Sequence, residues 1–235
     1  MHRRVSAFNS YTIEAPDGKV GSVSDILFED NDWKVRWFVI DTGPWLSGRR
    51  ILVHPTALGR PDIRNHAFPV TLTKAQVEAS PEISTDPPVY LQVGQNPSDY
   101  YCYGESFGGG FYGADGLGLT TGVIPQMSGW KSVNDAPVGD PHLRSLGEVK
   151  GYHIRALDGD IGHLDDFLVD DESWKIDHAI VDTKNWGFGK HVLVALEDIK
   201  KVDWAERYIQ IDLTRYKIRC SPSWKEPDWS SPPGG

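Results

Sequence analysis

The chain has 235 residues, a formal net charge of −9 and a sequence pI near 5.3. This acidic balance opposes strong electrostatic binding to nucleic acid or to an anionic bilayer, because both need clustered Lys and Arg side chains. The two cysteines, Cys102 and Cys220, form no framework that repeats along the chain, and no apolar run is long enough to span a membrane. We therefore expect free thiols in a soluble, cytoplasmic protein.

The chain contains an internal duplication. At a constant offset of 141 residues, residues 11–81 align without a gap with residues 152–222. A period this long indicates a doubled domain rather than a solenoid, whose repeats run about 20 to 50 residues. The predicted organisation is a lead-in at residues 1–10 with Arg3 and Arg4 exposed, a first domain at 11–81, an irregular linker at 82–141, a second domain at 142–223 and a flexible tail at 224–235.

Each copy is predicted to begin with a β-hairpin. In the first copy a strand starts at residues 11–13, and Asp17-Gly18 supplies the positive φ that a tight turn needs. The next strand, residues 20–28, carries Gly21 near its start, and the second copy carries Gly162 at the same place. A glycine inside a strand indicates a bulge or a bend.

The later elements of each copy are short strands and one helical turn. Residues 35–41 and 176–182 are rich in β-branched and aromatic residues, which is typical of a strand. Further strands are predicted at 51–53 and 68–72, with counterparts at 192–194 and 208–213, and Thr73 and Thr214 can each cap a helical turn. Many short strands at near-regular spacing predict an all-β fold of two tandem small β-barrels with little helix.

The sequence resembles the PRC-barrel family. The likeness is carried by the Gly-x-Val/Leu-x-Asp pattern that ends at Asp25 and Asp166, by the apolar strands that end in Asp-Thr, and by the Leu-Val strands after them. This family includes the β-barrel domain of the photosynthetic reaction centre H subunit and the C-terminal part of the ribosome maturation factor RimM. The resemblance implies a tandem pair of such barrels, and its known settings are electron-transfer complexes and ribosome assembly.

No pattern in the sequence predicts catalysis, a metal or a cofactor. The string Gly108–Gly113 matches GxGxxG but follows no strand and opens no helix, so a loop is favoured over a nucleotide site. The histidines lack HExxH spacing, and the acidic turns lack the ligand spacing of an EF-hand. The Asp-Thr pairs at 41–42 and 182–183 are interpreted as turn locks rather than active sites, because both copies keep them at a strand end.

The strand at residues 35–41 has two apolar faces. Alternation places Val35, Trp37 and Val39 on one face and Phe38 and Ile40 on the other, so one face needs a cover outside the barrel interior. We expect the two barrels to provide it by pairing within the chain, with the aromatic central segment as the competing cover. The candidate structural and interface residues are therefore Trp37, Phe38, Ile40, Asp41, Thr42, His178, Val181, Asp182 and Thr183. His178 replaces Trp37 and is expected to be partly buried between the barrels.

Three functions remain open. The leading hypothesis is a non-enzymatic binding or assembly module that presents a surface to a protein partner, in a photosynthetic or electron-transfer setting. The alternative is a ribosome or RNA-assembly factor by analogy with RimM, which the acidic balance disfavours. A small-molecule or enzyme role of the central segment is the third.

Overall fold

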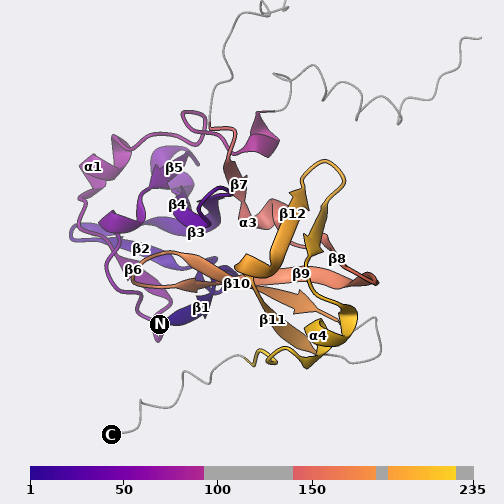
Figure 1. Ribbon diagram of the computed structural model, residues 1–235. Helices are drawn as coiled ribbons and strands as arrows, with labels where there is room; N and C mark the ends of the chain where they lie inside the picture. The colour runs from indigo at the N-terminus through magenta and orange to yellow at the C-terminus, as the bar shows by residue number, and fades with distance from the viewer. Residues whose placement is uncertain (93–139, 184–189, 226–235) are drawn as a thin grey trace, which may run out of the picture.

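The computed structural model of the protein describes residues 1–92, 140–183 and 190–225 (Figure 1). Most of the predicted linker, the loop at residues 184–189 and nearly all of the predicted tail lie outside the described residues. Cys102 and the glycine motif at residues 108–113 lie there as well. Cys220 is a free, exposed thiol.

The first repeat forms a mostly antiparallel sheet with the strand order β5-β4-β3-β2-β6. Its strands are β2 (Thr12–Ala15), β3 (Gly18–Glu29), β4 (Lys34–Asp41), β5 (Arg50–Val53) and β6 (Ala67–Pro69). Strands β2 and β6 pair in parallel. Helix α1 (Lys74–Glu78) follows and is capped by Thr73, as the sequence predicts. Short 3-10 helices lie at Val5–Phe8, Gly43–Leu46, Pro55–Ala57 and Val89–Leu91.

The second repeat has the same plan, with the strand order β11-β10-β9-β8-β13-β12. Its strands are β8 (His153–Ala156), β9 (Gly159–Asp170), β10 (Ile176–Asp182), β11 (His191–Ala195), β12 (Ile199–Asp203) and β13 (Tyr208–Ile211). Helix α4 (Arg215–Cys220) is capped by Thr214, again as predicted. Helix α3 (Leu146–Val149), the 3-10 helix Leu196–Asp198 and strand β12 were not predicted.

The predicted all-β class is confirmed, but the strand pairing of the described residues forms two open sheets rather than closed rings. The edge of the sheet explains this difference. Along the outer side of β5, Leu52 donates its backbone N–H to the carbonyl of Pro81 at 2.8 Å, and Ile83 donates to Arg50. In the second repeat, Leu193 of β11 donates to Pro222 in the same way. The end of each repeat, continued by Ile83 after the first, therefore occupies the outer edge of the sheet that ring closure would need.

Two glycines fix the first hairpin of each repeat. A Cβ on Gly21 would lie 2.2 Å from the carbonyl oxygen of Asp41, and one on Gly162 would lie 2.1 Å from that of Asp182. Beside them the register shifts so that Val20 and Ile161 have no partner residue on the neighbouring strand. The predicted bulge is thus confirmed in both repeats, and the missing Cβ lets adjacent strands approach closely.

The N-terminal arms of the two repeats are exchanged. Strand β1 (His2–Arg4) pairs with β9 of the second repeat, with Arg3 opposite Val169. Strand β7 (Leu143–Ser145) pairs with β3 of the first repeat, with Arg144 opposite Phe28. In Figure 1 indigo β1 accordingly accompanies the orange strands of the second repeat. Both pairings match at the offset of 141 residues, so the duplication extends upstream of Tyr11.

The expectation that Arg3 and Arg4 are exposed is wrong. Their side chains are only 11% and 19% exposed. Arg3 donates to Asp171 at 2.7 Å, and Arg144 in the other arm donates to Asp30 in the equivalent pair, also at 2.7 Å. The sequence suggested a solvated N-terminal segment because the acidic partners of these arginines lie far away along the chain.

One aspartate in each repeat receives the arm of the other. Asp25 accepts the hydroxyl of Ser145 at 2.6 Å and the backbone N–H of Gly147. Its counterpart Asp166 accepts Nε of Arg4 at 3.1 Å and both the hydroxyl and backbone N–H of Ser6. Burial raises the pKa of Asp25, against the opposing effect of its hydrogen bonds. The Gly-x-Val/Leu-x-Asp pattern therefore encodes arm docking in both copies.

The turns between the two long strands of each repeat also cross over. Val35 donates its backbone N–H to the carbonyl of Trp174, and Ile176 donates to that of Trp33, at 2.9 and 2.8 Å. The ring of Trp174 packs edge-on against Phe38 with centroids 5.0 Å apart. As a result, one continuous hydrophobic core contains buried residues of both repeats.

A second, smaller cluster covers the outer face of the first sheet. Leu27, Val39 and Leu52 are buried against Leu143 of β7 and Ile83, with Trp37 packed at the edge. Leu143 lies in the predicted second domain and Ile83 in the predicted linker, so residues from both parts of the chain cover this face of the first sheet.

Candidate binding surface

The predicted Asp-Thr pairs lie at the ends of β4 and β10 and stabilise the loops that follow. The Thr42 hydroxyl donates to the carbonyl of Arg49 at 2.8 Å, and the Thr183 hydroxyl donates to that of Lys190 at the same distance. Asp41 accepts the backbone N–H of Gly43. Both threonine side chains are buried and engaged, which is the geometry of a turn lock.

The remaining predicted residues are divided between core and surface. Phe38, Ile40 and Val181 are buried in the shared core. Trp37 is partly buried and donates its indole N–H to Asp86 at 2.8 Å. His178 is half-exposed and lies 2.9 Å from Asp177, whose other oxygen contacts His2 of the exchanged arm. These residues form no single cluster, so the surface that could meet a partner has to be sought elsewhere.

The two terminal helices differ in a way that the rest of the repeats do not. Helices α1 and α4 begin with the same contact: Asp17 accepts the backbone N–H of Lys74, and Asp158 accepts that of Arg215. Each buries one apolar residue, Val77 or Ile218. Their inner faces are therefore equivalent.

The outer faces of these helices have diverged. Along α1 the sequence is Lys-Ala-Gln-Val-Glu, whereas α4 has Arg-Tyr-Lys-Ile-Arg at the same positions. One cation and one anion in α1 become three cations in α4. The chain as a whole carries a net charge of −9, so this concentration of positive charge is a local feature.

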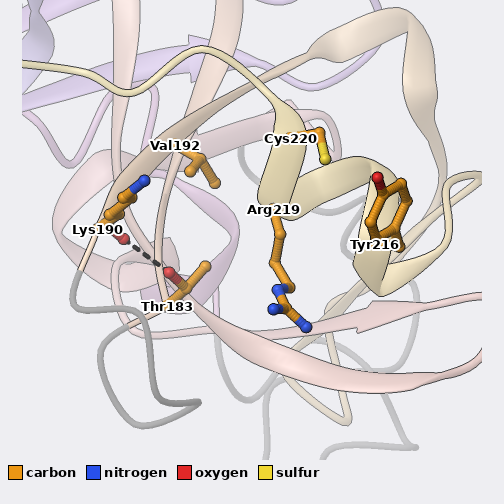
Figure 2. Close-up of a pocket in the computed structure, with 6 residues that line it drawn as sticks. All are labelled: Thr183, Lys190, Val192, Tyr216, Arg219 and Cys220. Carbon is orange, nitrogen blue, oxygen red and sulfur yellow. Dashed lines mark hydrogen bonds between the residues drawn. The ribbon is translucent and has the colours of Figure 1, made fainter.

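Helix α4 borders a pocket against the end of the sheet (Figure 2). Tyr216, Arg219 and Cys220 line it from the helix, and Thr183, Lys190 and Val192 line it from the facing strands. Its volume is about 140 Å³. Lys190 and Arg219 supply positive charge at its walls, so the pocket suits a small acidic or hydrogen-bond-accepting group.

A second pocket of about 280 Å³ shares Tyr216 and Arg219 with the first. Its lining residues are Asp158, Ile161, Arg215, Tyr216 and Arg219. The Tyr216 side chain belongs to both pockets and is 72% exposed. An exposed aromatic side chain between arginines is a composition favoured at protein interfaces. We call Arg215, Tyr216 and Arg219, together with the two pockets, the α4 surface.

A larger hollow at the junction of the repeats is a weaker candidate. It has a volume of about 520 Å³ and includes Arg3, Arg60, Asp171 and Glu172. Its charges are paired with each other, Arg3 with Asp171 at 2.7 Å and Arg60 with Glu172 at 3.4 Å. The hollow therefore offers little net charge to a ligand.

The sequence-based interpretation missed the α4 surface. The repeat alignment contains the signal, because Ala75 aligns with Tyr216 and Glu78 aligns with Arg219. Within the three described ranges, no group of three His, Cys, Asp or Glu side chains has the arrangement of a metal site. Among those same residues, none of the helices has the length and apolar character needed to cross a bilayer.

Comparison with known proteins identifies one part of the chain. The family model for the PRC-barrel domain matches residues 13–77, which lie in the first repeat. An uncharacterized protein of Deinococcus radiodurans is 38% identical over 68 residues, which are 29% of this chain and 24% of that protein. The chain thus matches about a quarter of the length of that relative.

Proposed function

Because residues 13–77 belong to the PRC-barrel family, we propose that this chain is a non-enzymatic binding module in which two paired repeats present the α4 surface to a protein partner. The observation that carries the proposal is the divergence of α4 from α1 on an otherwise equivalent frame. A structural role alone would leave the two helices under the same constraints. Cytoplasmic placement and an assembly setting belong to the same proposal.

The exchanged arms support the view that the two repeats act as one body. Each arm contributes a strand and an arginine to the opposite repeat. We propose that the tandem duplication provides within one chain what a C2 dimer provides between two identical chains. Once the chains are joined, each repeat can change on its own outer face, so a single binding surface can arise.

The test is quantitative capture from a native extract with the full chain as bait. Tyr216→Ala and Arg219→Ala change α4, whereas Glu78→Ala changes the position of α1 that corresponds to Arg219. We expect the same protein to be captured by the wild type and by Glu78→Ala, and to be lost at least tenfold with either α4 variant. Unchanged capture by the α4 variants would overturn the assigned surface. Recovery of ribosomal particles as the captured species would favour the alternative of a ribosome-assembly factor.

A further inference from the structure

Two histidines face each other on adjacent strands of the second repeat. His153 of β8 is the register partner of His163 of β9, and the centroids of their rings lie 4.7 Å apart. The backbone N–H of His153 points away from β9, because it donates to the carbonyl of Arg207 at 3.0 Å. The two residues therefore form a non-hydrogen-bonded pair of the antiparallel ladder, in which facing side chains come closest together.

The rings of His153 and His163 differ from the other histidines in having no polar partner. All eight histidines lie within the described ranges. Five have a polar side-chain partner, namely His2 and His178 with Asp177, His54 with Thr56, His142 with Asp30 and His191 with Asp165. His66 packs edge-on against Tyr11. For His153 and His163, the described residues supply neither a hydrogen bond nor an ion pair to the ring nitrogens, so these nitrogens can bind a ligand.

The first repeat has the same local backbone without the imidazoles. Thr12 and Ser22 occupy the equivalent positions, 141 residues earlier, and are also register partners. The backbone N–H of Thr12 donates to the carbonyl of His66, just as that of His153 donates to Arg207. A requirement of the fold does not explain the two histidines, because a threonine and a serine satisfy it in the first repeat.

The spacing of the two rings suits a shared metal ion. A histidine nitrogen binds a divalent transition metal at about 2.0–2.1 Å, so the ring centroids of two neighbouring ligands on one ion lie roughly 4.5–5 Å apart. The observed separation of 4.7 Å falls in this range. His153 is exposed and His163 is partly buried, so an ion can reach both from solvent. Because paired strands hold both ligands, an ion bound to one meets the other at high effective concentration.

The charges around the pair do not oppose a cation. Asp182 of β10 is the register partner of His163 on its other side and adds a negative charge to the same row. Arg155 lies two residues further along β8, but its guanidinium is 3.3 Å from Asp160 and 4.3 Å from the centroid of the Tyr208 ring. The positive charge of this arginine is therefore offset locally.

We propose that His153 and His163 form a two-histidine site for a divalent first-row transition-metal ion and bind Cu²⁺ most tightly. Two imidazole nitrogens with water at the remaining positions give the tetragonal set of nitrogen and oxygen ligands that Cu²⁺ prefers, and Cu²⁺ is the strongest binder among these ions. With two protein ligands, the site differs in kind from the three-residue groups that the described ranges lack. The inference goes beyond the proposed function and does not depend on the α4 surface.

The experiment titrates the metal-free full chain with Cu²⁺ by calorimetry, and electron paramagnetic resonance identifies the nitrogens bound to the ion. We expect the tightest equivalent to be held by two imidazole nitrogens. His153→Ala and His163→Ala should each weaken its binding at least tenfold and remove one nitrogen from the spectrum. His178→Ala, which changes another histidine of the same repeat, should leave binding within twofold. Zn²⁺ should bind more weakly than Cu²⁺.

Thermal unfolding adds a second readout. The metal-free midpoints of the three variants should match the wild type, because the changed side chains are exposed or only partly buried. Cu²⁺ should raise the midpoint of the wild type and of His178→Ala, but not that of His153→Ala or His163→Ala, since a ligand that binds only the folded state stabilises it.

Three results would overturn the inference. The first is a wild type that binds no equivalent of Cu²⁺ through two imidazoles. The second is unchanged binding by His153→Ala and His163→Ala. The third is an equal or larger loss in His178→Ala, which would assign the ion to His178 with Asp177 and His2.

Discussion

The two repeats keep equivalent residues where they contact each other but differ on their outer helices. On the inner side, Asp25 and Asp166 receive the exchanged arms, and Trp33 and Trp174 cross between the repeats at equivalent positions. On the outer side, α1 and α4 keep their caps, the aspartate contact at their first residue and one buried residue, but their exposed residues differ. The contacts between the repeats thus constrain the residues of both copies together, whereas the residues of each outer helix can change independently. Substitutions made at paired positions can break or sharpen this contrast.

The largest effect is expected at the hairpin glycines. Gly162→Val would place atoms 2.1 Å from the Asp182 carbonyl and would force a side chain onto a φ of +155°. We expect a loss of more than about 4 kcal/mol in the free energy of unfolding, from the combined clash and strain. Gly21→Val meets the same clash without the positive φ and should lose less. Urea denaturation measures both, with the alanine variants as a milder series. Parent-like stability of the Val variants would contradict the close approach.

The crossing tryptophans should differ in the same assay. Trp174 is 9% exposed and contacts the rings of Phe8, Phe38 and Phe68. Replacing it with Ala should cost about 3–5 kcal/mol, as expected for a large aromatic side chain removed from a core. Trp33 is only partly buried and should cost less. Equal losses would mean that the two crossings contribute alike despite their different surroundings.

The arm-docking aspartates are expected to respond differently to removal of charge. Asp166 is 1% exposed and shares Arg4 with Asp165, so Asp166→Asn removes one of the two carboxylates that Arg4 contacts and weakens its charge-assisted hydrogen bonds. This change should cost about 2 kcal/mol. The hydrogen bonds that Asp25 accepts within the described ranges come from a hydroxyl and two backbone N–H groups, and a neutral side chain amide can still accept from them. Asp25→Asn should therefore cost about 1 kcal/mol. A larger loss for Asp25→Asn would reverse this ranking.

The pH dependence of protein stability gives a second test of Asp25. Burial raises the pKa of Asp25 in the folded protein, so its protonated form is favoured there. Its contribution to stability is fully present below the ordinary pKa of an aspartate and is lost as the pH rises through the raised value. Asp25→Asn has no carboxyl group to titrate at this position, so this fall should be absent when its free energy of unfolding is measured between pH 3 and pH 7. A parallel profile in the variant would rule out this source.

The smallest effect is expected at the helix caps, where the repeats are equivalent. The Thr73 and Thr214 hydroxyls each accept a backbone N–H in the first turn, from Gln76 and Lys217. Replacement by Ala should cost about 1 kcal/mol in either repeat. A clear difference between the two would indicate that the outer faces also influence the helix starts.

The sequence was informative where structure depends on local chemistry. The Asp-Gly turns, the glycine bulges and the threonine caps were predicted because each rests on a preference of one or two residues. The exchanged arms were not, because Arg3 and Asp171 are 168 residues apart and nothing local links them. The α4 surface was missed for another reason. Tyr216 and Arg219 acquire meaning only beside Ile161 and Lys190, which the fold brings to them.

The exchanged arm also delays the completion of the first repeat during synthesis. Arg3 leaves the ribosome 168 residues before Asp171, its ion-pair partner. At about 5–20 residues per second, this interval lasts roughly 8 to 34 seconds. For most of that time the first repeat also lacks Arg144, the partner of Asp30, and strand β7, which borders β3. Such long-range contacts also slow folding after release. The nascent first half must therefore wait with an open sheet edge, and it is the stage at which chaperones would matter most.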